Sequence, residues 1–207
     1  MRKVETAHCE ARKEEIINAC LELYQSLSFK DITIKDIAEY TTFSIPSIYN
    51  YFETKEEIFL AIFQKEYENW KTDLDKIAKK KEKLSAKQFA NKLSKSLENR
   101  VMLLKLLSMN QFDMEEHSRL ERLVEFKKAY GDSVLALTNA LKRAFPSYNK
   151  TKCENFVSAF IPFMMGIYPC VFVSKKQNKA MLKAGINYKL QSISELTNRV
   201  VLSLLEK

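Results

Sequence analysis

The stretch FSIPSIYNYFETKEEIF, Phe43 to Phe59, contains a short apolar segment followed at once by the start of another helix. Ser44 is a residue type favoured at a helix N-cap, and Pro46 is tolerated in the first turn because its missing N–H has no partner there. Thr54 followed by Glu57 is a second helix-start signature, T-x-x-E. The stretch therefore predicts a short helix beginning at Ser44, joined closely to a longer helix beginning at Thr54.

The residues before this stretch predict two further helices. Apolar residues recur at helical spacing over residues 12–27. Thr33 with Asp36 three residues later is typical of a capping box, here at the start of a short helix over residues 34–40. Residues 41–43 then form a turn. Two short helices joined by a short turn and braced by neighbouring helices form a helix-turn-helix, an arrangement that binds DNA.

Such a motif places the exposed edge of its second helix against base edges in the major groove. Ile48 and Phe52, four residues apart, are expected to face inward. Asn50 can pair with adenine, and Ile45 can contact a thymine methyl group. Each residue has an ordinary structural reading when taken singly, as a cap or a surface residue, and the spacing of the whole set favours DNA binding. The predicted DNA-binding residues are Thr33, Ser44, Ile45, Pro46, Ser47, Tyr49, Asn50 and Lys55.

Composition bounds the fold but does not by itself indicate DNA. The 207 residues are 46% hydrophobic and 29% charged, and only three glycines and four prolines are present, which favours helices over turn-rich sheets and predicts an all-α protein. The net charge is +8, yet residues 1–65 contain eight Lys and Arg against eleven Asp and Glu. Much of the basic excess lies in residues 76–96, and a lysine run of this kind is typical of a solvated helix face.

Signatures of catalysis and of metal binding are missing from the sequence. No glycine-rich phosphate loop and no nucleophile with a base in motif form is present, and the two histidines have no partner at ligand spacing. We therefore expect no enzyme activity and no cofactor. The four cysteines are scattered, without a CxxC pair or a secretory signal, and are expected to be reduced thiols in the cytoplasm, Cys20 and Cys170 being buried.

The rest of the chain has a helical pattern from residue 85 onward, with a break at residues 146–150. Residues 156–173 lack any charge, which is consistent with a helix buried in an oligomer or, less simply, with a membrane span. A polar connection over residues 177–187 and a last amphipathic helix over residues 188–205 follow.

The segment TIKDIAEYTTFSIPSIYNYFETKEEIF resembles the signature of TetR-type transcriptional repressors, roughly T-x-x-x-I-A-x-x-A-G-V-S-x-G-x-x-Y-x-Y-F-x-[ST]-K-E-x-L. It departs from that pattern at Thr41-Thr42-Phe43, where Ala-Gly-Val is usual, so that the turn lacks its customary glycine. The second helix also contains no Arg or Lys, although the common guanine contact needs one. The N-terminal portion carries a net charge of −3, eight basic against eleven acidic residues, which predicts modest, salt-sensitive affinity.

The resemblance implies a helix-turn-helix domain at residues 1–53 and a ligand-binding and dimerisation domain at residues 54–207. It also implies a homodimer through the last two helices, a duplex operator and release by a small-molecule effector, with no membrane. A membrane-associated or partner-binding helical regulator with weak DNA binding stays as the alternative. The residues expected to line an apolar effector pocket, or else to form plain core, are Met102, Leu106, Met109, Phe112, Phe126, Tyr130, Phe163, Met164 and Tyr168.

Overall fold

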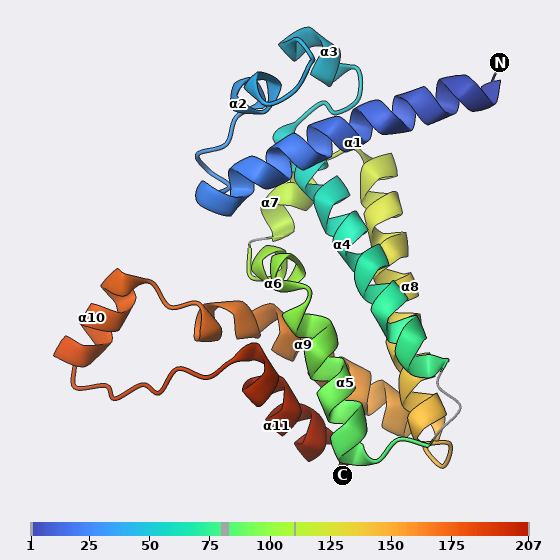
Figure 1. Ribbon diagram of the computed structural model, residues 1–207, viewed down its shortest axis with the longest axis vertical. Coiled ribbons are helices and arrows are strands. Elements are labelled where there is room, and N and C mark those ends of the chain that lie inside the picture. Colours follow the sequence, from blue (N-terminus) through green and yellow to red (C-terminus); the bar gives the residue numbers. More distant parts are fainter. Residues whose placement is uncertain (1, 80–82, 110, 207) are drawn as a thin grey trace. The chain divides into compact units, whose positions relative to one another are not determined.

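The computed structural model describes residues 2–79, 83–109 and 111–206, and for residues 2–7 the backbone alone. Within these residues every regular element is a helix and no strand is present, as the composition predicts. The helices are α1 (Arg2–Ser26), α2 (Ile34–Glu39), α3 (Ile45–Tyr49), α4 (Lys55–Ala78), α5 (Ala86–Glu98), α6 (Val101–Leu107), α7 (Gln111–Glu116), α8 (Leu120–Ala144), α9 (Lys150–Val171), α10 (Lys175–Lys183) and α11 (Ile193–Leu205) (Figure 1).

One compact unit, unit 1, comprises residues 1–65 and 110–128, and the other, unit 2, comprises residues 66–109 and 129–207. Helices α4 and α8 each contribute residues to both units. The helix-turn-helix segment, α7 and the beginning of α8 therefore belong to the same unit.

The core of unit 1 anchors the two short helices. The ring of Phe59 in α4 meets Tyr24 of α1 edge-on at 5.0 Å and Phe29 at 4.8 Å, measured between centroids. Ile37 of α2 and Ile48 of α3 are fully buried. Burying one such side chain contributes about 1.5–3 kcal/mol, whereas isolated helices of this length are unstable in water. Tertiary packing therefore holds these helices in place, with α2 against α1 and α3 against α2 (Figure 1).

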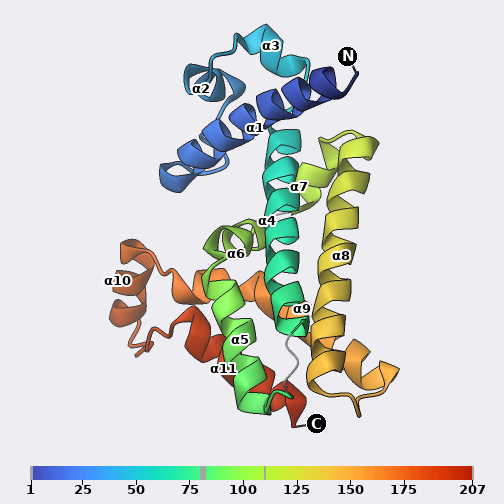
Figure 2. The same cartoon turned by 45° about the vertical axis from the view of Figure 1, so that its right-hand side comes forward.

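Unit 2 is built on α5, α9 and α11, which pack against one another, with α6 against α9 (Figure 2). The contact between α5 and α11 includes polar groups: Asn198 donates to the buried Ser94 hydroxyl at 3.0 Å. The only tryptophan of the chain, Trp70 of α4, is fully buried and donates its indole N–H to Ser96 of α5 at 3.1 Å. Polar pairs of this kind fix the register of helices that apolar packing alone leaves free to slide.

The uncharged segment predicted as a long helix is α9, which begins at Lys150. Pro162 and Pro169 lie inside this helix, and both are exposed. Among the described residues no single helix is both long and apolar enough to cross a bilayer, and α9 passes the test only together with α10, from which it is bent by 82°.

The C-terminal region differs from the sequence expectation in two places. Part of the expected polar connection is helical, as α10, and the last helix begins at Ile193 rather than at Tyr188. The second difference has a clear cause: Ser192 and Glu195 form a capping box, in which the Glu195 carboxylate accepts the Ser192 N–H at 2.7 Å. A satisfied N-cap starts a helix there, and residues 186–192 before it are not helical.

The cysteines also differ from expectation at one position. Cys20 is fully buried, as predicted, and burial raises the pKa of its thiol to about 12. Cys170, expected to be buried, is exposed in the last turn of α9.

Candidate nucleic-acid interface

Helix α2 begins with the predicted capping box. The Thr33 hydroxyl accepts the Asp36 N–H at 3.2 Å, and the Asp36 carboxylate accepts the Thr33 N–H at 2.8 Å and its hydroxyl at 2.7 Å. These hydrogen bonds from Thr33 lower the pKa of Asp36. Thr33 is exposed at this helix start, where N–H groups not bonded within the helix also point outward. The cap and a phosphate contact are therefore compatible roles for this residue.

The turn between α2 and α3 is built without glycine and without backbone strain. Among the described non-glycine residues none has a positive φ, so Thr42 does not adopt the conformation that a glycine would supply. Instead, the Glu15 carboxylate of α1 accepts the Thr42 N–H at 2.7 Å and its hydroxyl at 2.8 Å. These two hydrogen bonds lower the pKa of Glu15. A polar link from α1 thus holds the turn that Thr41-Thr42-Phe43 form.

Helix α3 has the two faces that its sequence predicts. Ile48 is 0% and Phe52 1% exposed, whereas Ile45 is 38% and Tyr49 50% exposed. Asn50, at the C-cap, is also exposed. The apolar side of the segment is therefore anchored in unit 1, and its other edge, which we call the reading edge and define as Ile45, Tyr49 and Asn50, faces away from the core.

The residues at the start of α3 are placed as expected, with one difference in bonding. Pro46 lies in the first turn and is exposed, and Ser47 is half-buried. Ser44 occupies the N-cap position with extended backbone, but its side chain makes no capping hydrogen bond. Its hydroxyl lies 2.9 Å from the Ser47 hydroxyl instead. The first N–H groups of α3 therefore have no side-chain cap from Ser44.

Lys55 has a structural role that the sequence reading missed. Its ammonium group donates to the carbonyl oxygens of Phe29 at 2.8 Å and Ile32 at 3.0 Å, and it lies 4.5 Å from the centre of the Phe29 ring. Two of its three N–H donors thus hold the loop between α1 and α2 against the start of α4. A phosphate contact by Lys55 would have to use the remaining donor.

Two arginines that the sequence does not predict as site residues also belong to this region. Arg119 lies just before α8, and Arg122 lies in its first turn. Arg119 and Arg122 bond to the chain between α3 and α4, and both donate to the carbonyl oxygen of Tyr51. More than 60 residues separate them from α3, so no local spacing signal exists. Tyr40, at the C-cap of α2, is 54% exposed and is likewise not among the predicted DNA-binding residues.

The residues expected to line an effector pocket are divided between the units. Phe112 and Phe126 belong to unit 1, and the others belong to unit 2. Phe112 is 80% exposed. The buried members are Leu106, Phe126 and Met164, and the half-buried members are Met102, Met109, Tyr130, Phe163 and Tyr168.

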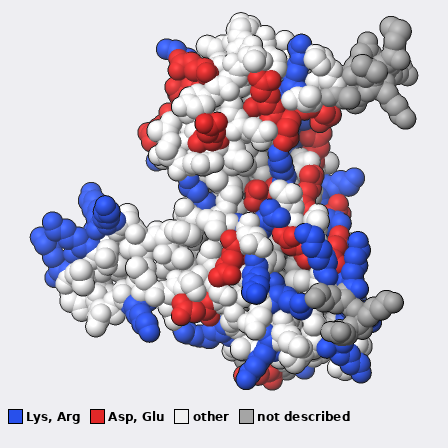
Figure 3. Space-filling model, viewed as in Figure 1, with Lys and Arg blue, Asp and Glu red and all other residues white. Residues whose placement is uncertain are grey.

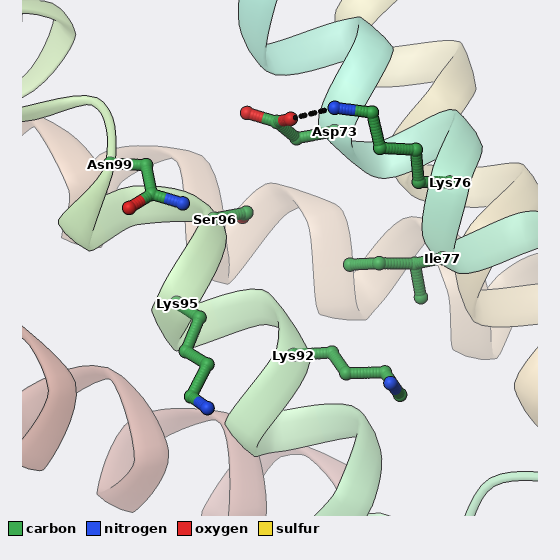
Figure 4. Close-up of a pocket in the computed structure, with 7 residues that line it drawn as sticks. All are labelled: Asp73, Lys76, Ile77, Lys92, Lys95, Ser96 and Asn99. Atoms are coloured by element: carbon green, nitrogen blue, oxygen red, sulfur yellow. Dashed lines mark hydrogen bonds and ion pairs between the residues drawn. The ribbon is translucent and has the colours of Figure 1, made fainter.

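A shallow pocket of about 200 Å³ in unit 2 has a different lining from the expected set (Figure 4). Its rim is basic, and its one carboxylate is already paired, because Asp73 accepts from Lys76 at 2.8 Å and from Arg100 at 2.8 Å. The lining residues are Asp73, Lys76, Ile77, Lys92, Lys95, Ser96 and Asn99, none of which belongs to the predicted apolar set.

Charge is unevenly distributed over the surface. On the face drawn in Figure 3, lysine side chains gather over α10, which contains Lys175, Lys176, Lys179 and Lys183. This cluster lies in unit 2 and not on the helix-turn-helix. The basic balance of the whole chain is therefore a poor guide to the interface.

Comparison with known proteins agrees with this geometry. The family model described as "Bacterial regulatory proteins, tetR family" matches residues 16–62, and that described as "Tetracyclin repressor-like, C-terminal domain" matches residues 64–191. The chain is 33% identical over 76 residues to an uncharacterized HTH-type transcriptional regulator, YfiR, of Bacillus subtilis (strain 168). That match spans 37% of each protein.

A solved structure of similar fold extends over nearly the whole chain. It is the crystal structure of a TetR transcriptional regulator from Rhodococcus sp. RHA1, with a TM-score of 0.55 and 14% sequence identity, covering 95% of this chain and 97% of that one. The two family models together cover the helix-turn-helix and most of the helical remainder. The chain belongs to the tetR family and is a DNA-binding transcriptional regulator rather than an enzyme.

Proposed function

We propose that this regulator is a dimeric repressor, which binds a pseudo-palindromic duplex operator and leaves it when a small molecule binds. The observation that carries the proposal is the two-faced α3, whose Ile48 is fully buried while the reading edge is exposed. A helix anchored in this way can enter a major groove without losing its core contacts. Two such helices related by a two-fold axis match the two half-sites of a pseudo-palindrome.

Each residue of the interface has a proposed role. Asn50 pairs with adenine and Ile45 contacts a thymine methyl group, and both are exposed. Tyr49 offers its hydroxyl to a phosphate. Thr33, Ser44, Pro46, Ser47 and the remaining donor of Lys55 complete the contact. Because the reading edge contains no Arg or Lys, we expect a preference for A·T pairs in the half-site.

A duplex carrying the sequence upstream of the protein's own gene tests the DNA proposal. Fluorescence anisotropy at about 0.15 M salt should show tighter binding to this duplex than to a shuffled one of equal length. Asn50→Ala should reduce that preference about tenfold, since one good base contact is worth about 1–3 kcal/mol. Asn178→Ala, an exposed asparagine of α10, is the matched control. Equal binding of the wild type to both duplexes would refute the proposal.

The dimer is proposed to form through α9 and α11. A stripe of small and apolar residues runs along the exposed side of α9, and α11 adds the half-buried Leu196, Val200 and Leu204. An uncharged stripe of this kind, left open to water, is typical of an interface between subunits. The structure inserts α10 between these two helices, so the expected pair is not consecutive. The exposed stripe consists of Ala159, Pro162, Met165, Gly166, Pro169 and Cys170.

Two glycines offer a matched test of the dimer. Gly166 lies in the stripe on α9, Gly131 lies on α8, and an added Cβ atom at either position meets nothing within 4 Å. Both substitutions to Glu are therefore tolerated by the subunit itself. Gly166→Glu should give a monomer in analytical ultracentrifugation, because a carboxylate would be buried in the interface, whereas Gly131→Glu should stay dimeric. A dimeric Gly166→Glu variant would contradict the proposed interface.

The effector is proposed to be apolar or aromatic and to bind among the Met and aromatic residues of the helical domain. The proposed division is a DNA-binding domain at residues 1–53 and an effector and dimerisation domain at residues 54–207, acting in the cytoplasm. Helix α4 runs through both compact units, which supports a mechanism in which effector binding tilts α4 and changes the spacing of the two reading edges.

A further inference from the structure

The segment from α7 to the first turn of α8 donates hydrogen bonds to the residues just after α3. We propose that Arg119 and Arg122 act as positioning residues, which bond to the Tyr51 carbonyl just beyond α3 and hold the reading edge in its DNA-binding orientation without themselves contacting DNA. This inference rests on the proposed operator binding by the reading edge.

The segment just after α3 is bonded to a distant part of the chain. With five residues, α3 is too short to be stable alone, and the last carbonyl groups of any helix lack partners within it. The carbonyl of Tyr51, two residues beyond α3, accepts from Arg122 Nη2 at 3.1 Å and from Arg119 Nη2 at 3.4 Å. A positive charge at this end also interacts favourably with the helix dipole.

Arg119 is itself held in a fixed position. Its Nε and Nη2 atoms donate to the two carboxylate oxygens of Glu57, each at 2.6 Å, and its backbone N–H donates to the same carboxylate at 3.1 Å. Glu57 is buried and also accepts the Glu53 N–H at 2.9 Å. Thr54 adds a bond from its hydroxyl to the His117 carbonyl at 2.9 Å. The first turn of α4 and the residues before α8 are therefore joined by several directed bonds.

Arg122 bonds to the same segment from a second direction. The guanidinium carbon lies 5.5 Å from the centre of the Phe52 ring, and Nη1 pairs with Glu125 at 2.9 Å. Phe52 is one of the two inward anchors of the reading segment and is 1% exposed. Arg122 thus contacts both the ring that anchors the reading edge and the carbonyl next to it, so its loss should loosen α3 while leaving the core side chains in place.

A direct phosphate contact is the competing explanation for an arginine in this region, and it predicts a different salt dependence. Losing a phosphate contact reduces the slope of log K against log salt by about 0.9. Losing a positioning residue lowers affinity at every salt concentration and leaves the slope unchanged. It also loosens α3 in the free protein, which a phosphate contact does not do.

The experiment compares Arg122→Ala with Lys128→Ala, which removes the same charge from an exposed position on the same helix. Hydrogen exchange in the absence of DNA measures the exchange rates of the amide N–H groups of Ile48, Tyr51 and Phe52. Each of them donates to a carbonyl within this segment. Fluorescence anisotropy with the upstream duplex, measured over a series of salt concentrations, gives the affinity and the slope of log K against log salt. Arg122→Met, which keeps an apolar side chain over the Phe52 ring, is measured in parallel and replaces Arg122→Ala if the latter does not fold.

We expect these amides to exchange about tenfold faster in Arg122→Ala, and the affinity to fall about tenfold at constant slope, as for loss of one charge-assisted hydrogen bond. Lys128→Ala should change neither by more than about twofold. Unchanged exchange, or a slope reduced by about 0.9 per subunit, would overturn the positioning role. If the wild type does not prefer the upstream duplex, the proposed operator binding fails, while exchange in the free protein still decides whether Arg122 holds α3.

Discussion

The contact between Arg119 and Glu57 allows one stability prediction to be worked out closely. Substituting Arg119 by Ala removes both 2.6 Å bonds to the Glu57 carboxylate and the weaker contact to Glu53 at 3.3 Å. Glu57 has 0% side-chain exposure, so its charge would keep only hydrogen bonds from backbone N–H groups. The variant therefore leaves a buried carboxylate without its counter-ion.

Breaking a fully buried ion pair costs about 3–5 kcal/mol. Arg119 is 39% exposed, so water screens its half of the pair, and we take about 2–3 kcal/mol as the expected loss. For a domain of this size that loss lowers the melting temperature by roughly 5–10 °C. Arg199→Ala, at an exposed arginine whose Nη1 lies 3.4 Å from Gln191, should cost less than about 0.5 kcal/mol and is the control.

The loss should depend on pH in a defined direction. Burial opposes ionisation of Glu57, but hydrogen bonds from Arg119 and from the N–H groups of Glu53 and Arg119 outweigh it and lower its pKa. A lowered pKa contributes stability that is fully present above the unfolded value, about 4.3, and is lost as the pH falls through the folded value. In Arg119→Ala the guanidinium bonds and charge that lower this pKa are lost while burial remains, so less of that stability is left above the unfolded value.

The difference between wild type and variant should therefore be largest near neutral pH and shrink toward pH 4. Urea unfolding followed by circular dichroism, at pH 7 and pH 4 and at one protein concentration, measures both values. A loss of the same size at the two pH values, or a loss under about 1 kcal/mol at pH 7, would refute the assignment of Glu57 as a buried charge stabilised by Arg119.

Three other predictions concern separate parts of the chain. Glu15→Gln should destabilise the protein by about 1 kcal/mol at pH 7 in urea titrations, because charge-assisted bonds from Thr42 become bonds to a neutral amide oxygen. The difference should vanish in acid, because the same bonds lower the pKa of Glu15 and favour its ionised form. Glu22→Gln, exposed on the same helix, is the control. Trp70→Phe should lower the free energy of unfolding by about 1–2 kcal/mol, because the hydrogen bond to Ser96 is lost. In the wild type, the fluorescence of the buried indole should peak at short wavelength until the protein unfolds. A long-wavelength spectrum of the native protein would contradict the burial of Trp70. Alkylation of Cys170, exposed in the single subunit, should slow as protein concentration rises, because the proposed dimer covers α9; a rate independent of concentration would argue against that interface.

Local signals in the sequence were sufficient for the helix-turn-helix. The Thr33 capping box, the inward placement of Ile48 and Phe52 and the exposure of Tyr49 were all predicted, because caps and periodicity depend on neighbours three and four residues away. The missing glycine was recognised as a problem for the turn. Its solution, a carboxylate from α1, was not predicted, because Glu15 lies 27 residues from Thr42.

Weaker local signals produced the errors. The sequence predicts a polar connection where α10 stands, because this helix is rich in Lys and, with no buried residue, needs no apolar stripe. The apolar spacing continues backward through Leu190 and so predicts too early a start for the last helix, whereas the capping box of Ser192 and Glu195 sets its first residue at Ile193. The sequence predicts a buried Cys170 because residues 156–173 carry no charge, and periodicity cannot say which side of such a helix faces the core.

The amino-acid sequence by itself determined the all-α class, the two-faced reading helix and the family, since each depends on residue types a few positions apart. Only the tertiary structure decided what holds that helix in place. The ammonium of Lys55, the carboxylate of Glu57 and the guanidinium groups of Arg119 and Arg122 find partners 23 to 71 residues away. The sequence around a charged side chain does not indicate which carbonyl group or counter-ion it will bond. That pairing depends on which helices the core brings together.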